Sequence, residues 1–259
     1  MYFAVSDPHI HGQSGDHPHL SGSDALIQAG VVVHPDVDVP RGRDFLRTWM
    51  FRAEHGRPFV TWKVASSIDG FIAPDAHTQV SLTGAATKAE VHMLRSQVGA
   101  VITGTGTIAV DDPQLTSRNE DGVPRGFQPR RVAVGQRDIP ADASIVGTDG
   151  LFTHARTHEI GQVLAALAAE GVHHVLLECG PGLAGAFLVG DYVDDIIWFV
   201  SPLPLGAGIA AAPGIHGEVE GGVPGWHVVA VDDCGQDRRL TLAPDRTHTD
   251  NCIVHASLL

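Results

Sequence analysis

Residues 175–188 read VLLECGPGLAGAFL and place a G-x-G-x-x-G pattern, Gly180 to Gly185, directly behind an apolar run. The run at 175–177 predicts a buried strand, and the apolar residues after the glycines predict a short helix. Glycines at such a turn let a phosphate approach the backbone, and the start of a helix presents unpaired N–H groups. The stretch therefore predicts a strand, a phosphate-binding turn and a helix, which is typical of an α/β fold.

A Rossmann nucleotide site does not account for this pattern. A Rossmann fingerprint opens the first βαβ unit, and an acid follows about 20 residues on, at the end of the next strand. Here the glycines come late, and the next predicted strand, 196–200, ends without an acid. Two interpretations stay open: a phosphate cradle outside the Rossmann topology, or a tight turn at Gly180 and Gly182 with close packing at Gly185.

Apolar runs recur regularly after residue 56. Helices are predicted over 87–97 and 158–170, with a short one after Gly182. Because most of the apolar runs are continuous rather than alternating, we expect a mostly parallel sheet that is covered on both faces. The last two strands are expected to pair antiparallel. The predicted strands are 59–65, 100–103, 131–134, 174–177, 196–200, 226–231 and 238–242.

The first 56 residues differ from the rest of the chain. A loop rich in Gly, Ser, His and Asp comes first, and we then expect a short helix from Ala25, a glycine stop, a strand through Val33 and a second helix ending near Gly56. The histidines of this region have no Cys nearby and no helical spacing, so we expect solvated side chains and no metal site. They are His9, His11, His17, His19 and His34.

The composition limits the classes of function. Of 259 residues, 17 are Lys or Arg and 30 are Asp or Glu, so the net charge is −13 and we expect no attraction to nucleic acid or an anionic membrane. The three cysteines are odd in number and lack C-x-x-C spacing, which predicts neither a disulfide framework nor a zinc site. No run approaches the roughly 18 apolar residues of a membrane span, and no signal-peptide pattern opens the chain. We expect a cytoplasmic protein.

Four segments, taken together, resemble one known family. They are 63–70 (KVASSIDG), 82–118 (LTGAATKAEVHMLRSQVGAVITGTGTIAVDDPQLTSR), 176–188 (LLECGPGLAGAFL) and 193–206 (VDDIIWFVSPLPLG). In this order they are similar to the reductase domain of the bifunctional riboflavin-biosynthesis deaminase/reductase. The most specific motif is T-G-x-G-T-x-x-x-D-D-P-x-L-T-x-R at 103–118. The resemblance implies a dihydrofolate-reductase-like α/β fold: a mixed, mostly parallel sheet with helices on both faces, plus a small N-terminal appendage.

The resemblance also divides the chain into three parts. Residues 1–56 resemble the end of the family's deaminase domain and its linker, 57–244 the NADPH-dependent reductase domain, and 245–259 are a C-terminal tail. The zinc elements of the deaminase, H-x-E and P-C-x-x-C, are absent from residues 1–56, the part that resembles the deaminase. Deaminase activity is therefore not expected. The family resemblance implies a homodimer.

The reaction implied by the resemblance is the NADPH-dependent reduction of 5-amino-6-(5-phosphoribosylamino)uracil, with hydride delivered to C1 of the sugar. Opening the sugar ring requires a group that exchanges protons, and the candidates for this or for orienting work are Lys63, Asp111 and Glu178. The implied substrate-binding residues are Gln79, Arg95, Leu115, Arg118 and Glu178, with the arginines on the phosphate. The implied cofactor-binding residues are Ala65, Ser81, Thr107, Asp111, Gly180, Pro181, Gly182, Leu183, Ala184, Gly185 and Ala186.

These charged residues also have simpler interpretations. Arg95 follows Leu94 on a predicted helix and can be a solvated residue on its face. Lys63 can be a charge at a strand end, and Glu178 can cap the helix after Gly182. Asp111 can belong to a turn, since Asp-Pro commonly opens one.

The sequence departs from the family pattern in two places. The family's G-[ED]-S-x-W-I-[ST] element is replaced at 78–83 by TQVSLT, where Gln79 still offers hydrogen bonds but Ser81 cannot stack as Trp does. Gly135 stands where the family often has Asp. Two alternatives therefore stay open: an enzyme of this fold that reduces another substrate, such as a dihydropterin, or a non-catalytic nucleotide-binding relic. The joint presence of the charged residues favours an enzyme.

Overall fold

Two compact units make up the chain in the computed structural model. The structure describes residues 22–33, 39–75, 78, 80–212 and 225–245. Unit 1 comprises Met1–Arg47 and Thr249–Leu259, and unit 2 comprises Thr48–His248. The division falls within α2 (Val39–His55).

In unit 1 the expected short helix forms, but the expected strand does not. Helix α1 (Gly22–Gln28) is followed by Gly30, whose φ of 79° is the left-handed conformation typical of a helix stop. Residues 31–33 are not in a strand. The N–H of Val31 donates to the carbonyl of Leu26 at 3.0 Å, so it closes the helix end and is not available to a sheet.

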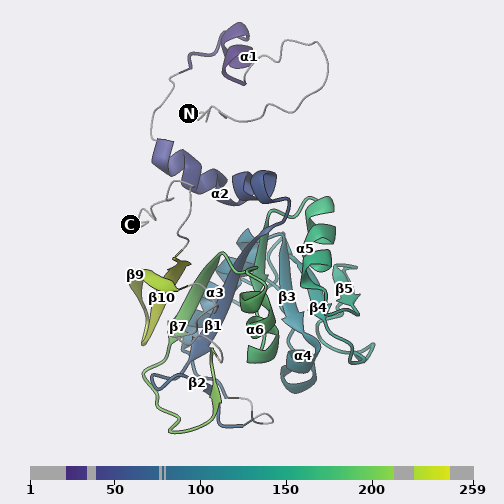
Figure 1. Ribbon diagram of the computed structural model, residues 1–259, viewed down its shortest axis with the longest axis vertical. Coiled ribbons are helices and arrows are strands. Elements are labelled where there is room, and N and C mark those ends of the chain that lie inside the picture. The colour runs from purple at the N-terminus through teal and green to yellow at the C-terminus, as the bar shows by residue number, and fades with distance from the viewer. Residues whose placement is uncertain (1–21, 34–38, 76–77, 79, 213–224, 246–259) are drawn as a thin grey trace. The chain divides into compact units, whose positions relative to one another are not determined.

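The main sheet of unit 2 has eight strands in the order β5-β4-β3-β6-β1-β7-β10-β9. Every strand that the sequence predicts after residue 56 is present, and β5 is added. The first six strands in this order run parallel, whereas β10 is antiparallel to both β7 and β9, as expected. Figure 1 shows β9 and β10 at one edge of the sheet and β5 at the other. The bounds are β1 (Phe59–Ser66), β3 (Ala100–Gly104), β4 (Arg130–Val134), β5 (Phe152–Ala155), β6 (His174–Leu177), β7 (Asp195–Val200), β9 (Trp226–Cys234) and β10 (Asp237–Pro244).

Helices cover both faces of this sheet, which confirms the expected layers. Helices α5 (Ile160–Ala169) and α6 (Pro181–Val189) bury apolar side chains against one face, together with Trp62 of β1. Helix α3 (Ala85–Gln97) packs on the other face, where Val91 meets Ile197 and Phe199 of β7. Because helices bury both faces of the sheet, the side chains on both faces of its strands are apolar, which explains the continuous apolar runs in the sequence.

Besides β5, three short elements were not predicted from the sequence. Strands β2 (Phe71–Ala73) and β8 (Ile209–Ala210) pair in a separate two-stranded sheet. Helix α4 (Thr105–Asp111) begins with Thr-Gly-Thr, residues of low helix propensity. Packing compensates for propensity, because Ile108 is buried and the left-handed Asp112 returns its N–H to the Ile108 carbonyl.

The strand order brings distant parts of the sequence to one edge of the sheet. Strand β6 lies between β1 and β3, and all three run in the same direction. Their carboxyl ends therefore meet, which is where ligands bind in open α/β sheets. Lys63 near the end of β1, the α4 turn after β3 and Glu178 after β6 all lie along this carboxyl edge.

Candidate active site

A buried carboxylate with two cations forms the centre of the candidate site. Glu178 is bound by Arg95 through two contacts, Nε to Oε1 at 2.6 Å and Nη2 to Oε2 at 3.0 Å. Lys63 Nζ lies 3.1 Å from Glu178 Oε2. The side chains of Glu178, Arg95 and Lys63 are only 7%, 14% and 19% exposed. The interpretations of Arg95 as a solvated residue and of Glu178 as a helix cap are therefore wrong.

The two cations determine the charge of Glu178. Burial alone would raise the pKa of this carboxyl, but Arg95 and Lys63 outweigh burial and lower the pKa to about 2. In turn, burial acts to lower the pKa of Arg95, and Glu178 reverses this and raises it. At neutral pH the cluster is therefore one anion between two cations, and Glu178 has no proton to donate.

The pKa of Asp111 is shifted in the opposite direction to that of Glu178. It is the last residue of α4, and partial desolvation raises the pKa of its carboxyl, although Lys63 acts to lower it. Within the described part of the chain, no hydrogen bond is assigned to this carboxylate. The neighbouring Asp112 forms the turn instead, accepting the backbone N–H and the hydroxyl of Ser144 at 2.7 and 2.8 Å. Asp111 is thus left available to a ligand.

The glycine turn lies beside α4. Gly180 donates its N–H to Thr107 Oγ1 at 3.1 Å, and Pro181 begins α6. Neither Gly182 nor Gly185 has a positive φ, and a Cβ at either position would meet nothing within 4 Å. A tight turn and close packing therefore do not explain these two glycines. They leave the α6 backbone open to a ligand, as a phosphate cradle requires.

The predicted substrate residues on the other side of the site already have partners within the protein. Arg118 donates to Thr116 Oγ1 at 3.1 Å, to the Gly122 carbonyl at 2.9 Å and to Gln114 Oε1. Leu115 adopts a φ of 52° and is buried in a core cluster rather than facing solvent. Their roles in substrate binding stay predictions.

For the remaining predicted site residues, the structure gives their element and their burial. Ala65 is two residues after Lys63 on β1, so both lie on the face that α3 covers, and Ala65 is partly buried there. Ser81 is exposed in the segment before α3. Leu183, Ala184 and Ala186 belong to α6 with the glycines. Gln79 lies outside the described residues.

His92 is a neighbour of the cluster that was not predicted. Its Nδ1 lies 3.1 Å from the Thr116 carbonyl, which also accepts from Arg95 Nη1 at 3.3 Å. Burial first, and Arg95 second, lower the pKa of His92. The spacing of three residues between His92 and Arg95 places both on one helix face and was a usable signal in the sequence.

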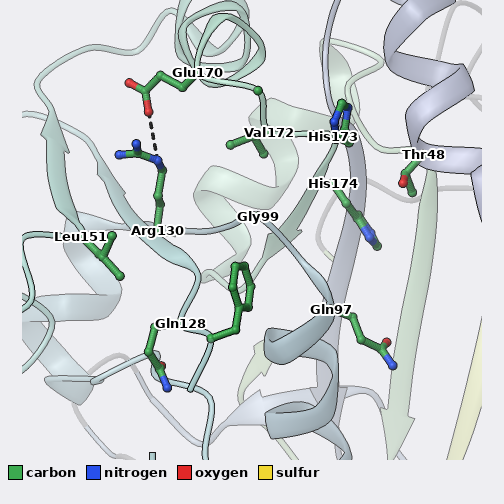
Figure 2. Close-up of a pocket in the computed structure, with 12 residues that line it drawn as sticks. Thr48, Gln97, Gly99, Gln128, Arg130, Leu151, Glu170, Val172, His173 and His174 are labelled. Atoms are coloured by element: carbon green, nitrogen blue, oxygen red, sulfur yellow. Dashed lines mark ion pairs between the residues drawn. The ribbon is translucent and has the colours of Figure 1, made fainter. Parts of the chain in front are cut away.

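A cavity of about 450 Å³ lies at the opposite edge of the sheet. Its lining includes residues just before or at the start of β3, β4 and β6, and Figure 2 shows Arg130 and Glu170 paired beside it, with Nε and Oε2 3.1 Å apart. It contains none of the predicted site residues. The charged cluster, rather than this cavity, is therefore the candidate active site.

Two further features concern metals and membranes. Among the residues that the structure describes, no group of three or more His, Cys, Asp or Glu side chains is arranged to hold a metal ion. The histidines singled out in the first 56 residues lie outside the described ranges. No helix in the described part of the chain is long and apolar enough to cross a membrane.

Comparison with known proteins connects this geometry to one family. The family model described as the RibD C-terminal domain matches residues 58–231. The riboflavin biosynthesis protein RibD of Mycobacterium tuberculosis (strain CDC 1551 / Oshkosh) is 36% identical over 243 residues, which cover 93% of this chain and 69% of that protein.

Two solved structures share the fold. Acinetobacter baumannii RibD, form 1, has a TM-score of 0.76 at 27% identity, covering 88% of this chain and 70% of that one. The diaminohydroxyphosphoribosylaminopyrimidine deaminase/5-amino-6-(5-phosphoribosylamino)uracil reductase from Thermotoga maritima has a TM-score of 0.68 at 23% identity, covering 86% and 67%. The fold expected from the resemblance is thereby confirmed.

Proposed function

The chain belongs to the RibD C-terminal domain family, and from that premise we propose that it is the pyrimidine reductase of riboflavin biosynthesis. It reduces the ribosyl group of 5-amino-6-(5-phosphoribosylamino)uracil to the ribitylamino product and uses NADPH as the electron donor. The observation that carries this proposal is the buried cluster of Lys63, Arg95 and Glu178 at the carboxyl edge, with Asp111 in electrostatic reach of Lys63. A decayed binding relic has no need of a buried carboxylate held between two cations.

The pKa shifts and contacts support a different role for each of the three predicted catalytic residues. Glu178 stays ionised, so it orients the Lys63 ammonium and does not itself exchange protons. Asp111, whose pKa is raised, is suited to pass a proton to the sugar ring oxygen when the ring opens. Lys63, with three donors, holds substrate oxygen atoms close to Asp111.

The cofactor fits the open backbone of the glycine turn. The nicotinamide supplies the hydride that is delivered to C1 of the opened sugar. Residues 180–186 and Thr107 hold the pyrophosphate, a role supported by the free space at Gly182 and Gly185. Ala65, Ser81 and Asp111 are assigned to the nicotinamide side.

The substrate is held by its phosphate and its base. Arg118 and Arg95 are assigned to the phosphate, and Leu115 and Gln79 complete the substrate side. Arg95 contacts the phosphate in this proposal while its guanidinium remains bound to Glu178. Residues 57–244 are proposed as the reductase domain, residues 1–56 as a deaminase-like appendage and 245–259 as a tail. A cytoplasmic homodimer is proposed from the family resemblance.

Steady-state turnover tests the proposed function. The purified chain is mixed with NADPH and the phosphoribosylaminouracil, and the loss of nicotinamide absorbance is followed, with dihydrofolate in a parallel reaction. Oxidation with the aminouracil alone is the expected result. Oxidation with dihydrofolate alone would assign the chain to a dihydropterin, and binding of NADPH without turnover of either would refute the substrate assignment.

A further inference from the structure

Helix α3 begins without a cap of its own. Gly84 occupies the N-cap position, where the side chain of a Ser, Thr, Asn or Asp ordinarily accepts a backbone N–H of the first turn. Instead, Oδ2 of Asp237 on β10 accepts the Gly84 N–H at 2.8 Å and the Thr87 hydroxyl at 2.6 Å. Asp237 and Thr87 are both buried. A residue 150 positions after Thr87 in the sequence therefore caps the helix.

This contact replaces a motif that a helix usually forms by itself. In a capping box, the third helical residue is Glu or Gln, and its side chain accepts the N–H of the N-cap residue. In α3 the third residue is Thr87, whose hydroxyl donates to Asp237 instead. Asp237 accepts the N–H of Gly84 in its place, and the helix dipole also favours a carboxylate at a helix start.

The turn between β9 and β10 packs closely against the same end of α3. A Cβ on Gly235, whose φ is 64°, would lie 2.9 Å from the Cβ of Ala86. Farther along the helix, Glu90 pairs with Arg239 of β10, Oε1 to Nη1 at 3.0 Å, and accepts the thiol hydrogen of Cys234 at 3.3 Å. The start of α3 therefore has a defined place on this hairpin, and the hairpin is part of the main sheet through β7.

The helix face that is held in this way extends to the candidate active site. Thr87, Val91 and Arg95 are spaced by four residues, so they lie along one face of α3. Val91 packs on β7. Arg95 contacts Glu178 two turns after Thr87, about 12 Å along the helix axis. A binding group on a helix is only as well placed as the contacts that hold the helix, so the position of Thr87 determines where Arg95 meets Glu178.

We propose that Asp237 is a positioning residue for substrate binding: by capping α3, it holds Arg95 on Glu178. The inference rests on the proposed function, because it takes Arg95 and Glu178 as groups that bind the aminouracil. Asp237 is 0% exposed, so it acts through α3 and not by contact with the substrate. Its loss should therefore change how the substrate is held and leave the cofactor cradle in place.

Steady-state kinetics of the full chain at saturating NADPH test this role. Asp237→Ala should raise the KM of the phosphoribosylaminouracil about 10-fold, since a small displacement of a positioned group can cost up to about 100-fold. It should leave kcat and the dissociation constant of NADPH nearly unchanged, because the hydrogen bonds of Asp237 go to α3 and not to α4 or α6.

Asp237→Asn is the conservative variant and should keep a KM close to that of the wild type. Its amide oxygen can accept both hydrogen bonds that Oδ2 of Asp237 accepts. The amide nitrogen would take the place of Oδ1, which is buried and has no partner among the described residues. Thr87→Val removes one of the two hydrogen bonds with little change of shape, so its KM should lie between those of the wild type and Asp237→Ala.

Asp194→Ala is the matched control. Asp194 is also buried and accepts a backbone N–H from another element, that of Val60 at 2.9 Å, but it lies at the amino ends of β1 and β7. Its loss should lower stability and leave the KM of the aminouracil unchanged. All variants are assayed well below their melting temperatures, and Thr87→Val supplies the same measurements if Asp237→Ala does not fold.

The NMR signal of the Arg95 Nε–H reports the position of this side chain without any substrate. In the wild type, Nε lies 2.6 Å from Glu178 Oε1, so its proton should exchange slowly with solvent. Asp237→Ala should speed this exchange, and Asp194→Ala should not. An unchanged KM and exchange rate in Asp237→Ala, or equal changes in both variants, would overturn the inference and leave the proposed function standing. A wild type without turnover would refute the proposed function, and the exchange rates alone would then decide the inference.

Discussion

Glu178 connects the electrostatics of the site to the stability of the protein. Its carboxylate is removed from water, and it remains ionised because Arg95 and Lys63 contact it directly. Removing one member of such a group leaves the others buried without a counter-charge, which costs more than the group itself contributes. Changes at Glu178 should therefore affect folding as well as catalysis.

Glu178→Gln should lower the free energy of unfolding by about 3 kcal/mol near neutral pH, because Arg95 and Lys63 lose their anion. The folded pKa of Glu178, about 2, lies below its ordinary value of 4.5. Its stabilisation is therefore complete above about pH 5 and is lost as the pH falls toward 2. Urea unfolding from pH 7 to pH 3 should show the difference between wild type and variant shrinking.

The exposed pair of Glu170 and Arg130 supplies the control for this prediction. These side chains are 48% and 40% exposed, so Glu170→Gln should change stability little at any pH. A gap between wild type and Glu178→Gln that is independent of pH would contradict the assigned charge of Glu178.

Asp111→Asn should abolish turnover and leave stability nearly unchanged. The substitution removes the proton-exchanging group, while no hydrogen bond within the described residues depends on that carboxylate. Turnover with the aminouracil and thermal unfolding are the two measurements. Asp112→Asn is the matched variant: it should retain turnover, since the Asp112 carboxylate is already occupied by two hydrogen bonds from Ser144. Equal turnover in the two variants would refute the role of Asp111.

Helix α6 carries a glycine that its own structure does not require. Gly185 lies inside the helix without positive φ and without a close neighbour, yet glycine is unfavourable there. A glycine that lowers stability, and that neither the backbone conformation nor the packing requires, is expected where a ligand must reach the backbone.

Gly185→Ala should therefore raise stability and weaken NADPH binding at the same time. The gain is about 0.5–1 kcal/mol, which corresponds to a rise of a few degrees in melting temperature. Differential scanning calorimetry and NADPH titration measure the two effects. Gly126→Ala, also in open space but in the loop before β4, should leave NADPH binding unchanged. Unaltered NADPH affinity in Gly185→Ala would contradict the cradle.

The elements differ in how far the sequence could predict them. Strands β1, β3 and β6 were predictable because each is a continuous apolar run between polar segments. Helix α4 was not, since tertiary packing of Ile108 overrides the low propensity of its glycine and two threonines. In the site, the residue types of Lys63, Arg95 and Glu178 were predictable from the resemblance, but their direct contact depends on β6 lying between β1 and β3.

The surroundings of individual side chains could not be predicted from the sequence either. Leu115 has a φ of 52° and is buried in a core cluster, which the sequence did not indicate, and its contact with the substrate stays a prediction. The position of Arg137 beside Gly106 depends on the pairing of β3 with β4, in which Gly104 opposes Val134. Spacing along the chain does not carry this information.

Considering the whole molecule, α2 crosses from unit 1 into unit 2, and its last turns belong to the packing of unit 2. Arg52 donates to the Ala168 carbonyl at 2.7 Å, and Phe51 contacts Phe59 edge to face with ring centroids 5.3 Å apart. Arg57 lies over the Phe51 ring at 4.8 Å. A domain boundary at residue 57 therefore cuts through packed side chains.

A chain that begins at residue 57 should be less stable than one that begins at residue 48. The additional nine residues restore a hydrogen bond, an aromatic contact and a cation–π contact, together worth about 2–3 kcal/mol. Urea unfolding of the two shortened chains measures the difference. Equal stability would instead support the boundary at residue 57.

Hydride transfer itself tests the central claim most directly. The full chain is incubated with the phosphoribosylaminouracil and NADPH carrying deuterium at the transferable position of the nicotinamide, and the product is analysed by mass spectrometry and NMR. The proposed function predicts a ribitylamino product with one deuterium, located at C1 of the sugar chain. A product without deuterium, or with deuterium on the pyrimidine ring, would contradict it.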